Sequence, residues 1–306
     1  MKRTAAMHYV IHSITEQHQL LSLPGPEHPL VSVIKFEDIQ YIPVDGTVHF
    51  STDFYTIAIK KGCECKFRYG QHYYDHDQGV MSFIAPGQML SWDEDDTPPP
   101  AGWLLVMHPD FIRGHALEQK IKEYGFFNYA ADEALHLSPG EEKMMETIME
   151  NIKQEYCSII DSYSQDVIIS HIELLLNYSN RFYNRQFITR KHTNNDVLIK
   201  LEALLTAYIN SPKLKENGLP TVRYISAQMN LSPNYLSDLL KKVTGQTTQQ
   251  HIHNKLIEKA RELLASSSLS VSEIAYYLGF EYPQSLSKLF KQKTSLSPSA
   301  FRSSFN

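Results

Sequence analysis

The chain has 306 residues, of which 42% are hydrophobic and 21% are charged. This is the length of about two domains with an ordinary globular composition, which argues against a disordered chain or a fibre. No apolar run reaches the roughly 18 residues of a membrane span. Polar residues follow the basic residues at the start, so we expect no secretory signal peptide. The three cysteines are too few for a disulfide framework. We therefore expect a soluble, cytoplasmic protein.

Charge is divided unevenly along the chain. Residues 195–306 contain 13 Lys and Arg against 8 Asp and Glu, which leaves 16 against 26 for residues 1–194, so the net charges are +5 and −10. A basic module behind an acidic body favours a polyanion partner for the C-terminal part. Charge alone does not decide this, because a solvated surface also carries +5.

The N-terminal part, residues 1–137, contains short runs typical of β-strands, separated by Gly and Pro turns. These runs are 31–36, 55–59, 65–69 and 103–106. Regular short strands with such turns predict a small β-barrel or jelly roll. The segment 77–88 also resembles the cupin-like sensory domains found in some bacterial regulators, which implies a sensory or regulatory role for this domain.

The same part contains few residues in an arrangement typical of catalysis or metal binding. His72 and His76 lie four residues apart, but no Glu follows at a suitable spacing and Leu90 stands where a cupin ligand histidine is often found. We therefore favour surface or pocket histidines over a metal site, and ordinary residues over a metal or redox pair for Cys63 and Cys65. No nucleophile, phosphate loop or carboxylate pair emerges, so we expect no catalysis and no cofactor.

Aromatic residues in this part have two interpretations. They line an apolar effector cavity inside the barrel, or they simply fill the core. The residues concerned are Tyr55, Phe67, Tyr69, Phe83, Trp92 and Trp103.

From Ser138 the pattern becomes helical, with Pro139 at the first helical position. One apolar stripe runs from Met144 to Tyr156, and a second helix carries a coiled-coil-like seam from Ile168 to Phe182. These stripes pack either on the chain's own barrel or on a second copy. Basic residues from Arg181 to Lys191 (Arg181, Arg185, Arg190 and Lys191) predict a polar hinge at the end of this region, 138–190.

An internal repeat dominates the C-terminal part. Residues 222–231 match 271–280 at a spacing of 49, and residues 235–241 match 285–291 at a spacing of 50. Each copy predicts a helix, a turn with Asn230 or Gly279, and a second helix; Gly245 ends the second helix of the first copy. Between the copies, residues 249–265 predict one continuous amphipathic helix. Two such copies favour a pair of helix-turn-helix units over ordinary helical hairpins.

The motifs Ile274-Ala275, Gly279-Phe280, Phe290-Lys291 and Ser297–Arg302 resemble the signature of AraC/XylS-type transcriptional regulators. The resemblance covers about residues 191–306 and implies two helix-turn-helix units, 221–245 and 270–295, joined by a linker helix. The chain departs from the family pattern at Ser295, where Gly is usual. Overall we predict an α+β multidomain protein, with a cupin-like β-barrel or jelly roll carrying helices and an all-α C-terminal domain.

The second helix of each unit supplies the predicted DNA contacts. Asn and Gln suit adenine edges, Lys suits guanine, and Asp accepts from cytosine. Lys241, Lys242, Lys291 and Arg223 are assigned to phosphates, which fix register without reading sequence. The full predicted set is Asn234, Tyr235, Ser237, Asp238, Lys241, Lys242, Gln284, Ser285, Ser287, Lys288, Lys291 and Arg223.

The resulting hypothesis is a sequence-specific regulator that binds double-stranded DNA and is controlled by a small-molecule effector in its N-terminal domain. The resemblance further implies a homodimer formed through the helices of 138–190, and RNA polymerase as a protein partner. Two alternatives stay open: a constitutive regulator whose N-terminal domain only dimerises or binds a protein, and a cupin enzyme with a DNA-tethering module.

Overall fold

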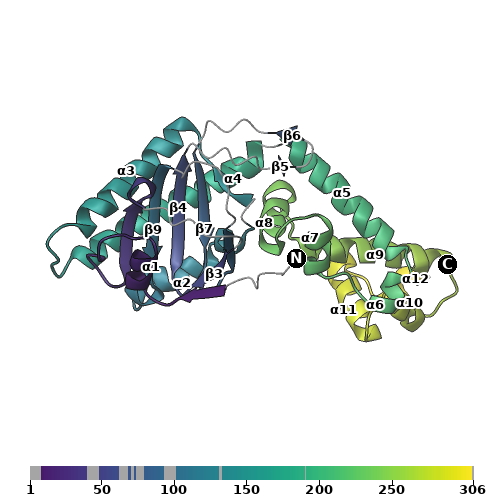
Figure 1. Cartoon of the computed structure of the whole chain (residues 1–306). Coiled ribbons are helices and arrows are strands. Elements are labelled where there is room, and N and C mark those ends of the chain that lie inside the picture. Colours follow the sequence, from purple (N-terminus) through teal and green to yellow (C-terminus); the bar gives the residue numbers. More distant parts are fainter. Residues whose placement is uncertain are drawn as a thin grey trace, which may run out of the picture. The chain divides into compact units, whose positions relative to one another are not determined.

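The computed structural model describes residues 8–39, 48–61, 68–69, 72–73, 79–92, 101–130, 133–189 and 191–304. Contacts divide the chain into two compact units, Met1–Gln186 and Phe187–Asn306. Each unit has its own buried core, and the first combines strands with helices whereas the second is helical (Figure 1). The two units are described separately below.

The first unit is centred on a five-stranded antiparallel sheet with the order β10-β7-β4-β9-β2. Its strands are β2 (Val31–Lys35), β4 (Tyr55–Lys61), β7 (Val80–Ile84), β9 (Ala101–Met107) and β10 (Leu135–His136). The central strands β4 and β9 are almost continuously buried. This burial explains why their sequences are apolar runs and not alternating patterns, because both faces of the sheet are covered.

A smaller sheet and a helix cover one face of the five-stranded sheet. The smaller sheet contains β1 (His8–Ile11), β3 (Val48–Thr52) and β8 (Leu90–Trp92), and β1 pairs with β3 in parallel. The helix α1 (Ile14–Leu20) follows β1, and a separate hairpin joins β5 (Arg68–Tyr69) to β6 (His72–Tyr73). The described strands thus form a five-stranded sheet, a three-stranded sheet and a two-stranded hairpin, and the cupin-like jelly roll stays a prediction.

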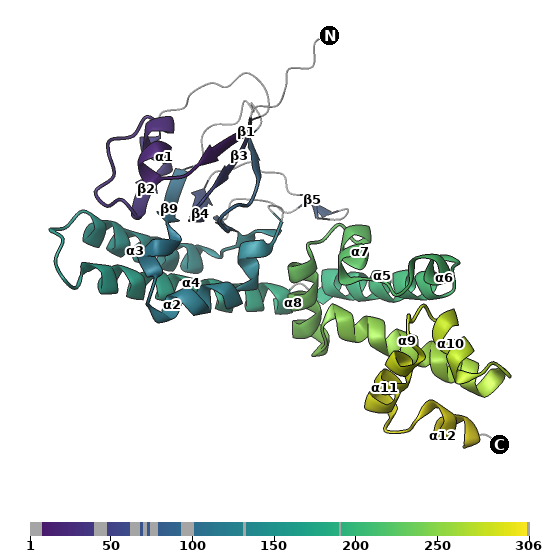
Figure 2. The same cartoon turned by 90° about the horizontal axis from the view of Figure 1, so that it is seen from below.

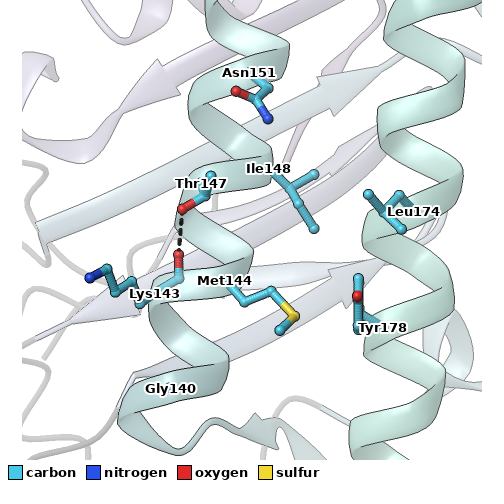
Figure 3. A pocket seen from close by; sticks show the side chains of 8 residues that line it. All are labelled: Gly140, Lys143, Met144, Thr147, Ile148, Asn151, Leu174 and Tyr178. Carbon is cyan, nitrogen blue, oxygen red and sulfur yellow. Dashed lines mark hydrogen bonds between the residues drawn. The ribbon is translucent and has the colours of Figure 1, made fainter.

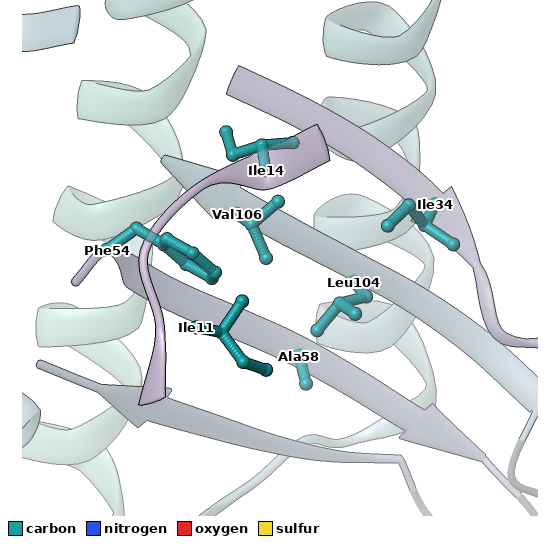
Figure 4. Close-up of a cluster of buried hydrophobic side chains, with 7 residues drawn as sticks. All are labelled: Ile11, Ile14, Ile34, Phe54, Ala58, Leu104 and Val106. Atoms are coloured by element: carbon teal, nitrogen blue, oxygen red, sulfur yellow. The ribbon is translucent and has the colours of Figure 1, made fainter. Parts of the chain in front are cut away.

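The apolar core between the two sheets defines what we call the inner face of the five-stranded sheet. Ala58, Leu104, Val106 and Ile34 point into it from β4, β9 and β2 (Figure 4). Ile11 of β1 and Ile14 of α1 meet them from the other side, and Phe54, directly before β4, completes the cluster. Side chains along a strand alternate between faces. Ile57, Ile59, Trp103 and Leu105 therefore point to the opposite face, which we call the helix face.

Two long helices cover the helix face: α3 (Pro139–Tyr156) and α4 (Ser164–Thr189) (Figure 2). Ser138 caps α3 with a complete capping box: its side chain accepts a bond from the backbone of Glu141, and the Glu141 side chain accepts one from the backbone of Ser138. Shorter segments complete the unit: η1 (Phe36–Asp38), η2 (Pro109–Ile112), α2 (Ala116–Lys120), η3 (Ile121–Glu123) and η4 (Gly125–Asn128).

The apolar stripes of these helices are buried in their own unit. Met145, Ile148, Met149, Ile152 and Tyr156 of α3 are all buried, and so are Ile168, Ile172, Leu175 and Phe182 of α4. The predicted seam from Ile168 to Phe182 therefore packs inside this unit and does not supply a dimer contact. Sequence periodicity predicted the stripe correctly but could not identify the surface that it packs against.

Polar contacts hold the end of α4 to the same unit. Arg185 forms an ion pair with Glu141 (2.9 Å) and donates to the carbonyl of His136 (2.7 Å). Gln186 accepts a bond from the backbone of His136 and donates to the carbonyl of Ala134. Arg185, predicted in a polar hinge, is thus anchored at the edge of the sheet.

The second unit is all-helical. Its helices are α5 (Lys191–Ile209), α6 (Lys213–Asn217), α7 (Val222–Gln228), α8 (Pro233–Thr244), α9 (Thr248–Ser266), α10 (Val271–Tyr277), α11 (Pro283–Thr294) and α12 (Pro298–Ser303). The pairs α7–α8 and α10–α11 correspond to the two copies of the repeat. The helix α9 joins them and is one residue longer at each end than the sequence predicted.

Candidate nucleic-acid interface

The second helix of each pair starts and ends at residues suited to those positions. Ser232 caps α8 by accepting a bond from the backbone of Tyr235, with Pro233 at the first helical position, and Gly245 ends the helix in the left-handed conformation (φ 75°). In the second pair, Pro283 again begins the helix but Tyr282 provides no side-chain cap. Ser295 ends α11 with φ 63°, where a glycine would carry no Cβ penalty.

The turn before each of these helices also requires a left-handed residue. Asn230 has φ 54° in the first turn and Gly279 has φ 78° in the second. A Cβ on Gly279 would lie 2.8 Å from the carbonyl oxygen of Leu214 and 3.0 Å from the carbonyl carbon of Gly218. Glycine is therefore needed in the second turn both for its backbone conformation and for the close approach of the α6 region.

The apolar side of each second helix packs into the domain core. Leu236, Leu239 and Leu240 of α8 are buried, as are Leu286 and Phe290 of α11. The ring of Phe290 also contacts the ring of Phe301 from α12, edge to face. These contacts fix the rotation of each helix about its axis, and they leave the opposite, polar side accessible.

The polar sides carry most of the predicted contact residues. Those that are exposed are Asn234, Lys241 and Lys242 on α8, and Gln284, Ser285, Lys288 and Lys291 on α11. Asp238 and Ser287 are partly buried. The spacings of 234, 238 and 241, and of 284, 288 and 291, place corresponding side chains on one helical face in each pair.

Ser237 is held within the domain. Its hydroxyl lies 3.0 Å from the hydroxyl of Thr248, which is buried at the start of α9. This bond ties α8 to α9 and leaves Ser237 only partly exposed. Sequence analysis did not single out Thr248, although its position after the cap residue Thr247 of the connecting helix is a recognisable signal.

Tyr235 does not belong to the exposed set. Its side chain is 1% exposed and its ring packs edge to face on Phe187, 5.2 Å between centroids. The prediction that Tyr235 contacts DNA is therefore wrong, because the side chain is part of the core of the second unit.

The cations assigned to phosphates are accessible to solvent. Arg223, Lys241, Lys242 and Lys291 are exposed. None of the four forms an ion pair with another described residue. In contrast, Lys255 on α9 pairs with Glu202 (3.4 Å) and Glu258 (3.0 Å).

The histidines of α9 add no positive charge near neutral pH. Burial lowers the pKa of His251, and the same effect, assisted by the nearby charge of Lys293, lowers the pKa of His253. His251 is hydrogen-bonded to the hydroxyl of Thr244, the last residue of α8 (2.9 Å). The positive potential of this surface therefore comes from lysine and arginine.

Three exposed tyrosines distinguish the second pair from the first. Tyr276 and Tyr277 on α10 and Tyr282 before α11 are 57%, 48% and 59% exposed. The repeat aligns them with Ala227, Gln228 and Ser232. Sequence reasoning passed over them, although the comparison of the two copies contains the signal.

The aromatic residues predicted to line a barrel cavity lie on the other side of the sheet. Tyr55, Phe83 and Trp103 belong to the helix face: Tyr55 packs on Phe127, and Phe83 packs on Phe126, Phe127 and Tyr183. They fill the layer between the sheet and the helices, so the cavity prediction is wrong for these three residues. Phe67 and the side chains of Tyr69 and Trp92 lie outside the described residues.

The described part of the chain offers no ready metal site. Among the described residues, no group of three His, Cys, Asp or Glu side chains is placed to hold a metal ion. Cys63, Cys65 and His76 lie outside these residues, and so does the side chain of His72. In the same part of the chain, no helix is long and apolar enough to cross a membrane.

Comparison with known proteins gives relatives for the second unit. A family described as a helix-turn-helix domain matches residues 225–304, from within α7 to the end of α12. The uncharacterized HTH-type transcriptional regulator YfiF of Bacillus subtilis is 30% identical over 146 residues, 47% of this chain and 43% of the relative. The HTH-type transcriptional activator RhaS of Escherichia coli O157:H7 is 37% identical over 78 residues, 26% of this chain and 28% of the relative.

The C-terminal part of the chain is thus similar to the helix-turn-helix domains of AraC-type regulators. A solved AraC-type transcriptional regulator from Chromobacterium violaceum is 20% identical and covers 36% of this chain and 93% of its own, with a TM-score of 0.33. The chain spans less than half the length of the curated relatives YfiF and RhaS. The AraC-type match thus concerns the C-terminal part, and the N-terminal unit is interpreted from its own structure.

Proposed function

We propose that the protein is a sequence-specific DNA-binding regulator of transcription. The observation that carries the proposal is the pair of exposed polar and basic helix faces, on α8 and α11, within the AraC-type domain. Each face belongs to the second helix of a helix-turn-helix unit, the element that enters the DNA major groove in such proteins. The relatives YfiF and RhaS are named transcriptional regulators, which supports the same role here.

The side chains suggest how each helix reads its site. On α8, Asn234 suits adenine and Asp238 suits a cytosine amino group; on α11, Gln284 suits adenine and Lys288 suits guanine. Lys241, Lys242, Lys291 and Arg223 suit the phosphates on either side. Ser237, Ser285 and Ser287 add hydroxyls that accept or donate, so they contribute little discrimination on their own.

The connecting helix sets the separation between the two readers. The 19 residues of α9 span about 28 Å at 1.5 Å per residue. Two helices that read one face of a duplex stand about one turn apart, roughly 34 Å. The length of α9 together with the width of each unit fits this separation, so we infer a bipartite site whose halves lie on one face of the DNA.

Selection of bound sequences from random DNA by the full-length protein tests this function. We expect one bipartite motif, and we expect Asn234→Ala and Lys288→Ala each to relax one position in a different half. The control is Lys259→Ala on α9, whose ammonium pairs with Glu262 (2.9 Å) of the same helix. Binding without any sequence preference would refute specific reading and leave a non-specific DNA tether.

We further propose that residues 1–137 form a cupin-like sensory or regulatory domain, that residues 138–190 form a helical dimerisation region and hinge, and that residues 191–306 bind DNA. The compact first unit, with a core of its own, supports a regulatory module that folds separately from the DNA reader. A small-molecule effector of this module regulates transcription only if its affinity differs between two states of the protein.

We also propose a homodimer. Its contact surface is not the buried seam from Ile168 to Phe182 but the outer side of α3 and α4. A shallow groove of about 460 Å³ runs between α3 and α4. Met144 and Ile148 line it from α3, and Leu174 and Tyr178 from α4 (Figure 3). Lys143 lies at its edge. Met144 and Leu174 are 40% and 42% exposed, which is unusual for large apolar side chains in one place.

The segment between α3 and α4 carries exposed apolar residues that fit the groove of a second copy. Ile159, Ile160 and Tyr163 are strongly exposed at this tip, and Asp161 holds its shape by accepting bonds from the backbones of Tyr163 and Ser164. The tip and the Gly140 end of the groove lie at opposite ends of the same helical pair. A second copy packed antiparallel would place each apolar, acidic tip on the partner's groove beside Lys143, as a two-fold contact requires.

Sedimentation analysis of the full-length protein tests this dimer. Leu174→Glu and Ile159→Asp are expected to shift the protein toward monomer, because each places a charge in the apolar contact. Leu20→Glu, at an equally exposed leucine of α1, is the matched control. Unchanged association in both groove and tip variants would exclude this surface.

A further inference from the structure

A short segment of the second unit connects its two helix pairs. Residues 211–220 join α5 to α7 and contain α6. The helix α6 packs against α5 and also against α10, the first helix of the second pair (Figure 2). Its place in the chain, directly before α7, would by itself bring this segment only to the first pair. The segment, which we call the bridge, therefore gives the two pairs a contact in addition to α9.

The bridge meets the second pair backbone to backbone. A Cβ on Gly279 would lie 2.8 Å from the carbonyl oxygen of Leu214 and 3.1 Å from the Cα of Gly218. Gly218 and Gly279 both have positive φ, 72° and 78°, and neither carries a side chain that would keep the two backbones apart. The equivalent turn of the first pair contains Asn230, which has a side chain. A turn of this type therefore does not by itself require such a close approach.

The same bridge is held to the first pair. The side chain of Leu214 is only 2% exposed and anchors the bridge in the domain core. The hydroxyl of Tyr208, near the end of α5, donates to the carbonyl of Gly218 (3.1 Å). The ring of Tyr208 packs on the ring of Tyr224 in the first turn of α7, with 5.1 Å between centroids. Gly218 is thus tied to α5 and α7 on one side and to the turn of the second pair on the other.

The connecting helix α9 sets a distance between the two pairs but leaves a joint at its end. Residues 267–270, between α9 and α10, belong to neither helix. Rotation about the soft backbone dihedrals of such a joint would turn the second pair without changing the length of α9. Arg302 of α12 braces the joint by donating to the carbonyls of Leu264 and Leu269. The bridge adds a contact that reaches back from Gly279 to the first pair, so it opposes this rotation.

We propose that the bridge is a clamp that fixes the orientation of the two reading helices, α8 and α11, and thereby restricts the protein to one spacing between the half-sites of its DNA. Leu214, Gly218 and Gly279 are the positioning residues, and they act without touching DNA. The consequence for DNA rests on the bipartite reading proposed above, whereas the clamp itself does not. One inserted base pair moves a half-site by about 3.4 Å and turns it by about 35°, and clamped helices do not follow this change.

The distance between spin labels on α8 and α11 tests the clamp in the full-length protein without DNA. The labels are attached at two exposed positions, Lys242→Cys and Gln292→Cys, after serine has replaced the native Cys63, Cys65 and Cys157. We expect double electron–electron resonance to give one narrow distribution of distances. Leu214→Ala, which removes the buried anchor, should broaden this distribution, whereas Leu214→Met, which keeps the apolar bulk, should leave it narrow.

Binding to a series of duplexes tests the consequence for DNA. Both halves of the selected site are kept, and one or two base pairs are added or removed between them. For the wild type, each change should lower the affinity about tenfold or more, because one reading helix loses its base contacts. In Leu214→Ala the affinity for the selected spacing should fall, and the additional loss on the changed spacings should become severalfold smaller.

Leu201→Ala is the matched control, because it truncates a fully buried leucine of α5 outside the bridge. It should lower the melting temperature but change neither the distance distribution nor the spacing preference. An unchanged distribution in Leu214→Ala, or equal broadening in Leu201→Ala, would overturn the clamp. Should Leu214→Ala fail to fold, Tyr208→Phe decides: it removes only the bond to Gly218 and should broaden the distribution to a smaller extent, and a distribution as narrow as that of the wild type would overturn the clamp.

The two measurements separate this proposal from the proposed function. If Leu214→Ala broadens the distance distribution but keeps the wild-type spacing preference, the clamp stands and its role in selecting DNA fails, while specific DNA binding is unaffected. If the protein binds no specific DNA, the regulator proposal fails, and the distances between the labels still decide whether the bridge holds the two helix pairs together.

Discussion

The salt dependence of DNA binding provides the sharpest test of the interface. Four exposed cations without partners among the described residues, Arg223, Lys241, Lys242 and Lys291, are assigned to phosphates. Each phosphate contact adds about 0.9 to the slope of log affinity against log salt. Four contacts predict a slope of roughly −3.6 for one domain, so affinity should fall by about 150-fold when salt rises fourfold.

Replacing Lys291 by Gln removes one of these contacts without changing a base contact. The expected slope is about −2.7, and the same fourfold rise in salt should then cost only about 40-fold in affinity. Because phosphates carry no sequence information, the loss should be similar for every DNA sequence. Lys288→Gln is expected to behave differently: it should cost about 1–3 kcal/mol on the preferred site and little on a site changed at its base pair.

Fluorescence anisotropy on the selected site and on a scrambled duplex, across a range of salt, measures both quantities. Lys259→Gln is the control, since it removes the same charge from α9 but not from a proposed contact, and its slope should match that of the wild type. The assignment is refuted if Lys291→Gln keeps the wild-type slope or if it changes the preferred sequence.

Three further predictions concern the backbone and the charges. Ser295→Gly should stabilise the second unit by about 1 kcal/mol in urea unfolding, because it removes a Cβ from a left-handed residue; a destabilised variant would mean that the serine side chain has a role of its own. Gly102→Ala should cost more than about 3 kcal/mol, because a Cβ there lies 2.1 Å from the carbonyl of Ile59 on the paired strand, while Gly87→Ala, with open space around it, should cost only about 1–2 kcal/mol. The hydrogen bond and charge of Asp53 raise the pKa of His12. The contact should therefore stabilise the protein fully below the ordinary histidine pKa of about 6.5, and this stabilisation should be lost as the pH rises through the raised value. An unchanged dependence of stability on pH in His12→Ala would contradict this.

The second unit could be predicted closely because its signals are local. The spacing of Ile274, Ala275 and Leu278, the cap at Ser232 and the left-handed Gly245 each depend on neighbours within a few residues. The repeat then tested each copy against the other. The burial of Tyr235 could not be predicted in this way, because its ring packs on Phe187, nearly fifty residues away and outside the repeat.

The packing of the first unit could not be predicted from local signals. Alternation along a strand separates two faces but does not say which face meets helices and which meets a second sheet. Tyr55, Phe83 and Trp103 were predicted to lie inside a barrel, but they share the face that α3 and α4 cover. The stripe on α4 shows the same limit: its apolar spacing predicted its burial correctly but not the surface that buries it.

The two reading faces are alike in position and different in charge, and this difference constrains the DNA. Asp238 of α8 occupies the place of Lys288 on α11, while Lys241 and Lys291 correspond. A carboxylate favours a base that offers an amino group and disfavours the acceptors that attract a lysine. The two halves of one bipartite site should therefore differ at the base pair facing these residues, although the helices that read them arose as copies. Asp238→Lys should make the halves more alike, with a lysine in both reading positions. Sequence selection with this variant would then recover a more symmetric motif, and an unchanged motif would mean that Asp238, which is only partly exposed, does not reach the bases.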